Sequence, residues 1–237
     1  MYSIKQRVRY SEIDHTTHLT LTGIVNYFQD CSTFQSEDIG VGIEYWEKHK
    51  KGWILSSWQI IVKRYPKLGE ELEVGTWPTA FNGLYGTRNF IMKDQSGEVI
   101  AYANSIWVFM DREKGRPAKP QEEDIRAYEI EPELPMEYAP RKIVLPKEWE
   151  SRPAFPVRKS QIDTNGHVNN SRYIEMALEL LSKEMFTGQI RVEYKKSAMY
   201  GDMICPMIHE EEMKTIVKLC DEDGGLFAAV EFTGEKS

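Results

Sequence analysis

The chain has 237 residues, enough for one large domain or two small ones with a sizeable core. Hydrophobic residues make up 41% and charged residues 28%, which is an ordinary globular balance. The formal net charge of −7 argues against a general nucleic-acid binder, because such a protein presents a basic surface.

Targeting and metal-binding patterns are missing from the sequence. The first residues, MYSIKQRVRY, have no apolar run of the secretory kind, and no stretch approaches the ~20 apolar residues that span a bilayer. The three cysteines (Cys31, Cys205 and Cys220) are odd in number and form no close pair in the sequence, which favours a reducing, cytoplasmic setting. No C-x-x-C, H-x-x-x-H or P-loop pattern occurs, so we expect no metal and no nucleotide cofactor.

The first half opens on VRYSEIDHTTHL, residues 8–19, and then shows a helical pattern. Thr20 is a plausible N-cap, and four apolar residues follow it at helical spacing: Leu21, Ile24, Val25 and Phe28. Residues 53–65 alternate in the manner of a strand, and residues 86–110 predict a long hairpin that turns at 94–97. We therefore expect the first half to contain a strand, then a helix, then about four strands.

Residues 111–150 differ in composition from what precedes and follows them. Six of the eleven prolines lie here, among many charged residues. Because proline blocks regular ladder pairing, we expect an extended linker laid over the surface.

The second half repeats the first. Residues 157–168, VRKSQIDTNGHV, match residues 8–19 at six of twelve positions, all at one offset of 149. A second helical stripe follows, with Asn169 or Asn170 as its N-cap: Ile174, Ala177, Leu178, Leu181 and Met185. A strand at 189–197 and a hairpin at 214–232 come next.

A helix with one apolar stripe must pack on a flat hydrophobic surface, here an antiparallel sheet. The sequence thus predicts an α+β protein made of two tandem helix-on-sheet repeats. We expect an N-terminal repeat at 1–110, a proline-rich charged linker at 111–150 and a C-terminal repeat at 151–237.

Three polar residues alternate just ahead of the second helix: Asp163, Asn165 and His167. In an extended segment they would share one face, which gathers an acid, an amide and an imidazole around one small volume. Such residues also make ordinary turn and cap hydrogen bonds, which is the structural alternative. The first copy carries Asp14, Thr16 and His18 instead, so the amide is lost, and we expect Asp14 and His18 to be structural.

A helix on an antiparallel sheet, made twice in one chain, resembles the double hotdog fold. The segment DTNGHVNNSRYIEMALE resembles the second-half signature of the acyl-acyl-carrier-protein (acyl-ACP) thioesterases, and RVEYKKSAMYGD resembles their following strand. The resemblance spans essentially the whole chain, and the run D-x-N-x-H-V-N-N is specific to this group of hotdog proteins. It implies hydrolysis of the thioester between a fatty acyl chain and the phosphopantetheine arm of acyl carrier protein, so that the substrate carries the phosphopantetheine and no cofactor of the enzyme's own is expected. The net charge and the lack of a bilayer-length apolar run predict no nucleic-acid and no membrane partner.

By this resemblance, Asp163, Asn165 and His167 match the motif, and Glu193 matches an acid on the following strand. Asp163 is expected to be the nucleophile or the base that activates water, and His167 the general acid and base. Asn165 would donate to an oxyanion or hold His167. Glu193 would orient His167 or Asn165, or act as the base itself, and the sequence does not rank it against Asp163.

Two comparisons refine the expected site. Tyr194 stands where many plant members carry a cysteine, so a cysteine nucleophile is not expected. When the halves are aligned on their glycine turns, at an offset of 132, Ile61 stands at the position of Glu193. Only the second half then carries the full polar set, which predicts one active site per chain.

Three other functions stay open at this stage. They are an acyl-coenzyme A thioesterase, a hotdog hydratase or dehydratase, and a non-catalytic acyl-thioester-binding protein. Acyl chain length has no sequence signal, and both a monomer and a homodimer are compatible with paired hotdog repeats.

Overall fold

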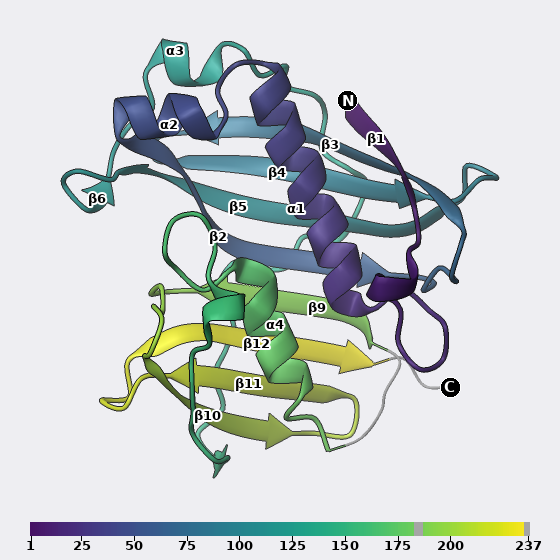
Figure 1. Cartoon of the computed structure of the whole chain (residues 1–237), viewed down its shortest axis with the longest axis vertical. Coiled ribbons are helices and arrows are strands. Elements are labelled where there is room, and N and C mark those ends of the chain that lie inside the picture. Colours follow the sequence, from purple (N-terminus) through teal and green to yellow (C-terminus); the bar gives the residue numbers. More distant parts are fainter. Residues whose placement is uncertain (183–186, 235–237) are drawn as a thin grey trace. The chain divides into compact units, whose positions relative to one another are not determined.

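The structure, a computed structural model, describes residues 1–182 and 187–234. The chain divides into two compact units (Figure 1). The first comprises Met1–Ser56 with Ile60–Tyr138, and the second comprises Ser57–Gln59 with Ala139–Ser237. The expected linker is therefore shared: its residues up to Tyr138 group with the first unit and those from Ala139 with the second.

The first unit is a helix packed on an antiparallel sheet, as predicted. The strands follow the order β1-β3-β4-β5-β2 across the sheet. They are β1 (Tyr2–Arg7), β2 (Lys51–Val62), β3 (Glu71–Asn82), β4 (Tyr85–Lys93) and β5 (Val99–Asp111). The shorter elements are η1 (Tyr10–Glu12), α2 (Ile43–His49), β6 (Arg116–Pro117), which pairs with β5, and α3 (Glu122–Ile125).

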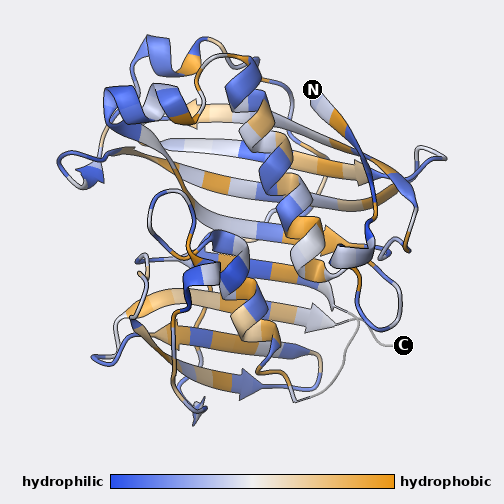
Figure 2. Cartoon of the chain, viewed as in Figure 1, coloured by the Kyte–Doolittle hydropathy of each residue, from blue (hydrophilic) through white to orange (hydrophobic). Residues whose placement is uncertain are grey.

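The main helix of this unit, α1 (Leu21–Asp38), begins where the sequence predicts. Its N-cap is Thr20, whose side chain accepts a hydrogen bond from the Gly23 N–H. The predicted stripe is buried, and the Phe28 ring lies 5.3 Å from that of Phe90 on β4, centroid to centroid. Figure 2 shows hydrophilic and hydrophobic residues mixed along α1, as expected of a helix with one buried face.

The second unit repeats this plan with a shorter helix. Its sheet has the order β9-β12-β11-β10-β7. The strands are β7 (Glu150–Ser151), β8 (Phe155–Pro156), which pairs with β10, β9 (Thr187–Tyr194), β10 (Met203–Glu210), β11 (Lys214–Cys220) and β12 (Leu226–Gly234). The 3-10 turn η2 (Lys159–Gln161) and the helix α4 (Asn170–Leu178) precede β9.

The helix α4 has nine residues, half the length of α1 with eighteen. Asn169 is its N-cap and accepts a hydrogen bond from the Ser171 N–H, which confirms one of the two predicted caps. Ile174 and Ala177 are buried as the stripe requires. Leu181 lies beyond the end of the helix, and Met185 falls outside the described residues. No helix in the described residues combines the length and apolar character that crossing a bilayer demands.

The second half of the linker lies on one face of the second sheet. Ile143 is 1% exposed and packs in a cluster with Ile216 of β11 and Ala229 of β12. Beside it, the Arg191 guanidinium donates to the carbonyls of Pro140 (2.5 Å) and Lys142 (3.1 Å). These bonds use the linker carbonyls that proline-rich backbone leaves without ladder partners. The segment is therefore docked on the sheet.

Truncating Ile143 tests this docking. We expect Ile143→Ala to lower the free energy of unfolding by about 2–5 kcal/mol, because it removes a fully buried side chain from a close-packed cluster. The neighbouring Val144 is 83% exposed, so Val144→Ala should change that free energy by no more than about 0.5 kcal/mol. Urea unfolding of both variants measures the difference, and equal effects would mean that the linker is not docked.

Candidate functional site

The candidate site is a tight turn that joins η2 to α4. Ile162 and Val168 form an isolated antiparallel bridge. Inside it, the Asp163 N–H donates to the His167 carbonyl (2.7 Å) and the Gly166 N–H donates to the Asp163 carbonyl (3.1 Å). The segment is not extended, so the expected alternation of side chains on one face is wrong. A closed turn brings the ends of the motif together instead.

Gly166 makes this turn easy to form. Its φ of +78° lies in the left-handed region, which glycine enters at no steric cost. The same turn in the first unit places Thr17 there, with φ of +66°. The two copies thus share one backbone shape.

Asp163 holds the turn with one carboxylate oxygen. Its Oδ1 accepts hydrogen bonds from the backbone N–H groups of Asn165 (2.8 Å) and His167 (3.2 Å). Within residues 1–182 and 187–234, its Oδ2 accepts no hydrogen bond. One oxygen is therefore structural and the other is available for chemistry.

The other two motif side chains are also available. Asn165 is exposed and His167 is half-buried. In the described part of the chain, neither the Asn165 amide nor the His167 imidazole makes a hydrogen bond. An acid oxygen, an amide and an imidazole from one five-residue turn are thus free to meet a ligand.

The start of α4 follows directly. Asn169 donates its N–H to the Gln161 carbonyl (2.9 Å), which closes the turn against η2. The dipole of a helix start favours negative charge nearby. Developing charge on a ligand oxygen beside this turn would therefore be stabilised.

The segment just after β9 borders the turn on another side. The Val168 N–H donates to the Ala198 carbonyl (2.9 Å), and His167 forms an isolated bridge with Met199. The Ala198 N–H in turn donates to the Tyr173 hydroxyl (2.8 Å). Sequence reasoning did not single out Tyr173, because an aromatic residue on a helix stripe is usually core.

Glu193 lies apart from the other three expected residues. It is 4% exposed, its Oε2 accepts the Ile143 N–H (3.1 Å), and its Oε1 pairs with Lys195 (2.5 Å). The next residue on β9, Tyr194, reaches the opposite way, since its hydroxyl donates to the Asn170 carbonyl on α4 (2.9 Å). Successive strand residues face opposite sides of a sheet. Glu193 therefore faces the linker, whereas the turn of Asp163, Asn165 and His167 adjoins the helix.

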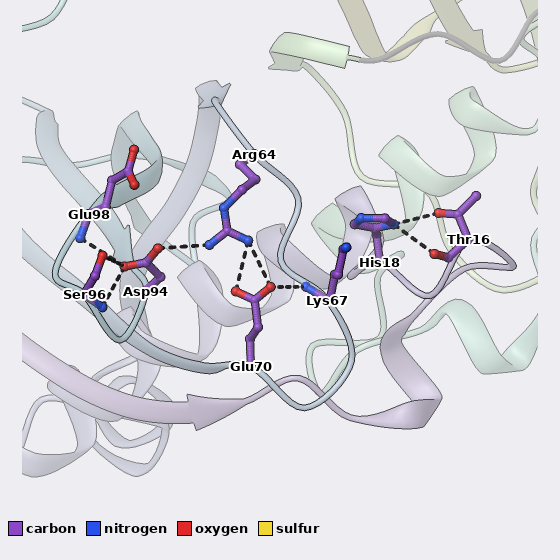
Figure 3. Close-up of polar contacts among 8 residues, drawn as sticks. All are labelled: Thr16, His18, Arg64, Lys67, Glu70, Asp94, Ser96 and Glu98. Carbon is purple, nitrogen blue, oxygen red and sulfur yellow. Dashed lines mark hydrogen bonds and ion pairs between the residues drawn. The ribbon is translucent and has the colours of Figure 1, made fainter.

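The first unit contains the same turn with its polar groups paired internally. The Thr16 hydroxyl donates to Asp14 Oδ1 (2.6 Å) and lies 3.0 Å from Nδ1 of His18. Nδ1 of His18 also lies 3.0 Å from the Thr16 carbonyl oxygen, and Figure 3 shows both contacts. Thr16 thus engages Oδ1 of Asp14 and Nδ1 of His18, whereas in the described residues the side chain of Asn165, at the same position, bonds neither Asp163 nor His167.

The electrostatics of Asp14 reflect this pairing. Burial by itself would raise the pKa of Asp14, but the hydrogen bonds from the Thr16 hydroxyl and from the N–H groups of His18 and Thr16 outweigh it. The pKa of Asp14 therefore lies below its ordinary value.

The turn of the first unit is also held by an ion-pair network, drawn in Figure 3. Arg64 bonds Glu70 and Asp94, each at 3.0 Å, and Glu70 accepts the Lys67 N–H at 2.8 Å. Lys67 forms the isolated bridge with His18. These contacts hold the backbone of Lys67, which forms the bridge to His18. Among the described residues, no group of three or more His, Cys, Asp and Glu side chains gathers as a metal-ligand set.

Two family models match the chain in tandem. The acyl-ACP thioesterase N-terminal domain covers residues 1–128, and the acyl-ACP thioesterase C-terminal domain covers residues 146–231. The chain belongs to the acyl-ACP thioesterase family. The resemblance inferred from the motif is thereby confirmed.

Curated relatives agree with this family. A chloroplastic acyl-[acyl-carrier-protein] hydrolase of Cuphea viscosissima is 29% identical over 80% of this chain and 50% of its own length. A chloroplastic oleoyl-acyl carrier protein thioesterase of Coriandrum sativum is 26% identical over 97% of this chain and 69% of its own. The chain thus spans about half the length of the first of these relatives.

The fold itself matches a solved acyl-ACP thioesterase from Bacteroides thetaiotaomicron. The TM-score is 0.89 at 24% identity, over 98% of this chain and 97% of the other. The 12:0-ACP thioesterase from Umbellularia californica gives a TM-score of 0.86 at 16% identity, over 100% and 98% of the two chains. The tandem hotdog architecture predicted from the sequence is confirmed.

The pairing in the first turn can be tested through its titration. Thr16→Val removes the hydroxyl that donates to Asp14, so we expect the pKa of Asp14 to rise toward its ordinary value. A carboxyl with a lowered folded-state pKa adds stability above its unfolded pKa and loses it as pH falls through the folded pKa. The variant should therefore be less stable than wild type near neutral pH, with the difference vanishing in acid.

Carbon-detected NMR titration of Asp14 and urea unfolding across a pH series measure this effect. Thr164→Val in the second turn is the matched control, since the Thr164 hydroxyl is exposed and makes no hydrogen bond in the described residues. An Asp14 titration that is the same in Thr16→Val and wild type would contradict the pairing.

Proposed function

We propose that the protein hydrolyses the thioester of fatty acyl-ACP, which yields a free fatty acid and the holo-carrier protein. Membership of the acyl-ACP thioesterase family supports the reaction class. The observation that carries the proposal is the contrast between the two turns. In the first turn the Thr16 hydroxyl donates to Oδ1 of Asp14 and lies beside Nδ1 of His18, whereas the second turn leaves the Asn165 amide and the His167 ring unpaired within the described residues. In that part of the chain, Oδ2 of the acid accepts no hydrogen bond in either turn.

Each of these groups has a role in the proposed reaction. Oδ2 of Asp163 either attacks the thioester carbonyl, forming an anhydride that water then hydrolyses to the free acid, or takes a proton from a water that attacks the carbonyl directly. The Asn165 amide donates to the oxygen of the tetrahedral intermediate, beside the helix start that favours negative charge. The departing thiolate is a good leaving group, and His167 supplies its proton or passes the proton of the attacking water to it.

Glu193 has two readings. The family resemblance makes it a base or an orienting residue for His167. Its bonds to the Ile143 N–H and to Lys195 favour a different role, which is to hold the linker on the sheet. We propose that Asp163, Asn165 and His167 form the catalytic set, and that Glu193 supports the fold behind β9.

The proposed reaction uses water and the side chains of this chain, with phosphopantetheine supplied by the substrate and no further cofactor. The partner is acyl carrier protein. The cytoplasm is the proposed location, because the three cysteines are free thiols, as is typical of reducing compartments.

The proposed activity is tested by thiol release from acyl-ACP across a series of chain lengths, with the corresponding acyl-coenzyme A substrates in parallel. Higher kcat/KM on the carrier-bound substrates supports the proposal. Higher kcat/KM on the coenzyme A substrates would make the enzyme an acyl-coenzyme A thioesterase. Addition of water to an enoyl thioester without thiol release would make it a hydratase, and tight binding without turnover would make it an acyl-thioester-binding protein.

Asp163→Asn tests the catalytic set with little risk to the fold. The amide oxygen can still accept the N–H groups of Asn165 and His167, so the turn should persist, but the substituted side chain is a poor nucleophile and base. We expect kcat to fall about 10³-fold or more. The matched control is Asp14→Asn in the first turn, which should keep wild-type kcat. Equal activity of the two variants would contradict the assignment.

Glu193→Gln separates the two readings of Glu193. The amide oxygen can still accept the Ile143 N–H, and only the ion pair with Lys195, which is 45% exposed, is lost. We expect kcat and its pH dependence to stay near wild type, while the free energy of unfolding falls by about 1 kcal/mol. A loss of turnover as large as that of Asp163→Asn would instead make Glu193 the base.

A further inference from the structure

The strap after β9, defined here as Lys195–Met199, makes two backbone hydrogen bonds at Ala198, one through its carbonyl and one through its N–H. On one side, the Ala198 carbonyl accepts the Val168 N–H (2.9 Å), one residue after His167. On the other side, the Ala198 N–H donates to the hydroxyl of Tyr173 on α4 (2.8 Å). Ala198 is fully buried and Tyr173 is 2% exposed. The strap therefore links the helix to the turn that carries the proposed catalytic residues.

The first unit has half of this arrangement. There the Leu19 N–H donates to the Pro66 carbonyl (2.7 Å), and His18 bridges to Lys67 just as His167 bridges to Met199. The bond between the strap and the turn is thus common to both copies.

The other half is confined to the second unit. Pro66 stands at the position of Ala198 and has no N–H to donate. Ile24 stands at the position of Tyr173 and has no oxygen to accept. Donor and acceptor are both present in the second copy and both missing from the first. The copy in which the amide and the imidazole are unpaired within the described residues is thus the copy with the second hydrogen bond at Ala198.

We propose that Tyr173 is a positioning residue for the thioester hydrolysis, holding Ala198 so that the strap fixes the turn of Asp163, Asn165 and His167. The proposal rests on the proposed function and deepens it. Tyr173 acts through Ala198 and Val168, and it does not itself transfer a proton.

The state of the phenol supports a positioning role. Burial, with the nearby charges of Asp163 and Asp202 adding to it and the Ala198 N–H opposing it, raises the pKa of Tyr173 to about 12. The phenol therefore stays neutral at physiological pH. A neutral hydroxyl is a steady acceptor for the Ala198 N–H, and its titration adds nothing to the pH dependence of turnover near neutrality.

The energetic reason for the effect is the buried N–H of Ala198. A buried donor that loses its acceptor keeps its desolvation penalty, so the backbone shifts toward any new partner. Such a shift moves Val168 and the adjoining His167, and small displacements of catalytic groups slow the chemical step strongly. Binding of the acyl chain would be unaffected.

A second tyrosine offers a matched control. Tyr194 donates its hydroxyl to the Asn170 carbonyl (2.9 Å), and its ring meets that of Tyr173 edge-on at 5.8 Å between centroids. Losing this hydroxyl orphans no buried donor, because the Asn170 carbonyl still accepts within the first turn of α4. Tyr194→Phe and Tyr173→Phe thus remove the same atom from neighbouring rings with different consequences.

The experiment compares wild type, Tyr173→Phe and Tyr194→Phe in the full chain. Kinetics of thiol release from acyl-ACP give kcat and KM, thermal unfolding gives Tm, and NMR amide exchange reports on Val168 and Ala198. For Tyr173→Phe we expect kcat to fall about 10- to 100-fold with KM unchanged, the pH profile keeping its shape, and faster exchange at both amides. Tyr194→Phe should match wild type in kcat and in the exchange of those amides.

Three outcomes would overturn the proposal. They are wild-type kcat in Tyr173→Phe, a fall in kcat without faster exchange at Val168, and equal losses of kcat and Tm in both variants. Failure of the proposed function is distinguishable, because wild type itself would then release no thiol. The amide exchange would still report whether Tyr173 holds Ala198.

Discussion

The hydrogen bonds from Oδ1 of Asp163 to the N–H groups of Asn165 and His167 are the interaction on which the site depends. They close the turn and fix the backbone positions from which the Asn165 and His167 side chains extend. The N-cap of α4, Asn169, follows two residues after His167. A carboxylate has two oxygens, so one can hold the backbone while the other stays open. Asp163 can therefore be both a structural and a reactive residue. A role in turn hydrogen bonds and a role in catalysis are thus compatible for this motif.

The duplication shows what the site adds to the scaffold. Both turns bond in the same way to the segment that follows their strand. The Leu19 N–H donates to the Pro66 carbonyl in the first unit, and the Val168 N–H donates to the Ala198 carbonyl in the second. Thr16 bonds Oδ1 of Asp14 and contacts Nδ1 of His18 in the first copy, and Pro66 has no N–H where Ala198 has one. The backbone is shared, and the chemistry is decided by a few side chains whose hydrogen-bonding capacity differs.

The two halves also differ in how they cover their sheets. The motifs at 8–19 and 157–168 align at an offset of 149, whereas the strands that follow align at an offset of 132. The first half therefore has 17 more residues between motif and strand, and these form the longer α1 and the added helix α2. The second half has the short α4 on one face and the linker on the other. On that face Glu193 and Glu231 are buried and Arg191 is half-buried. The Arg191–Glu231 pair at 2.8 Å and the Glu193 bond to the Ile143 N–H satisfy these groups. Buried charges of this kind are tolerated only when they are paired and hydrogen-bonded.

The sequence by itself determined the duplication, the α+β class, the starts and caps of both main helices and the family, because these follow from local periodicity, cap chemistry and a contiguous motif. It also predicted Asp163, Asn165 and His167 as site residues, and these three lie within one turn. It could not show that this segment is a turn rather than extended, since Oδ1 of Asp163 decides that by bonding backbone two and four residues away. Tertiary structure alone decided that Glu193 faces the linker and that Tyr173 meets Ala198. The face of a strand residue depends on the register of the whole sheet, and Tyr173 and Ala198 are 25 positions apart in the chain, so no local pattern relates them.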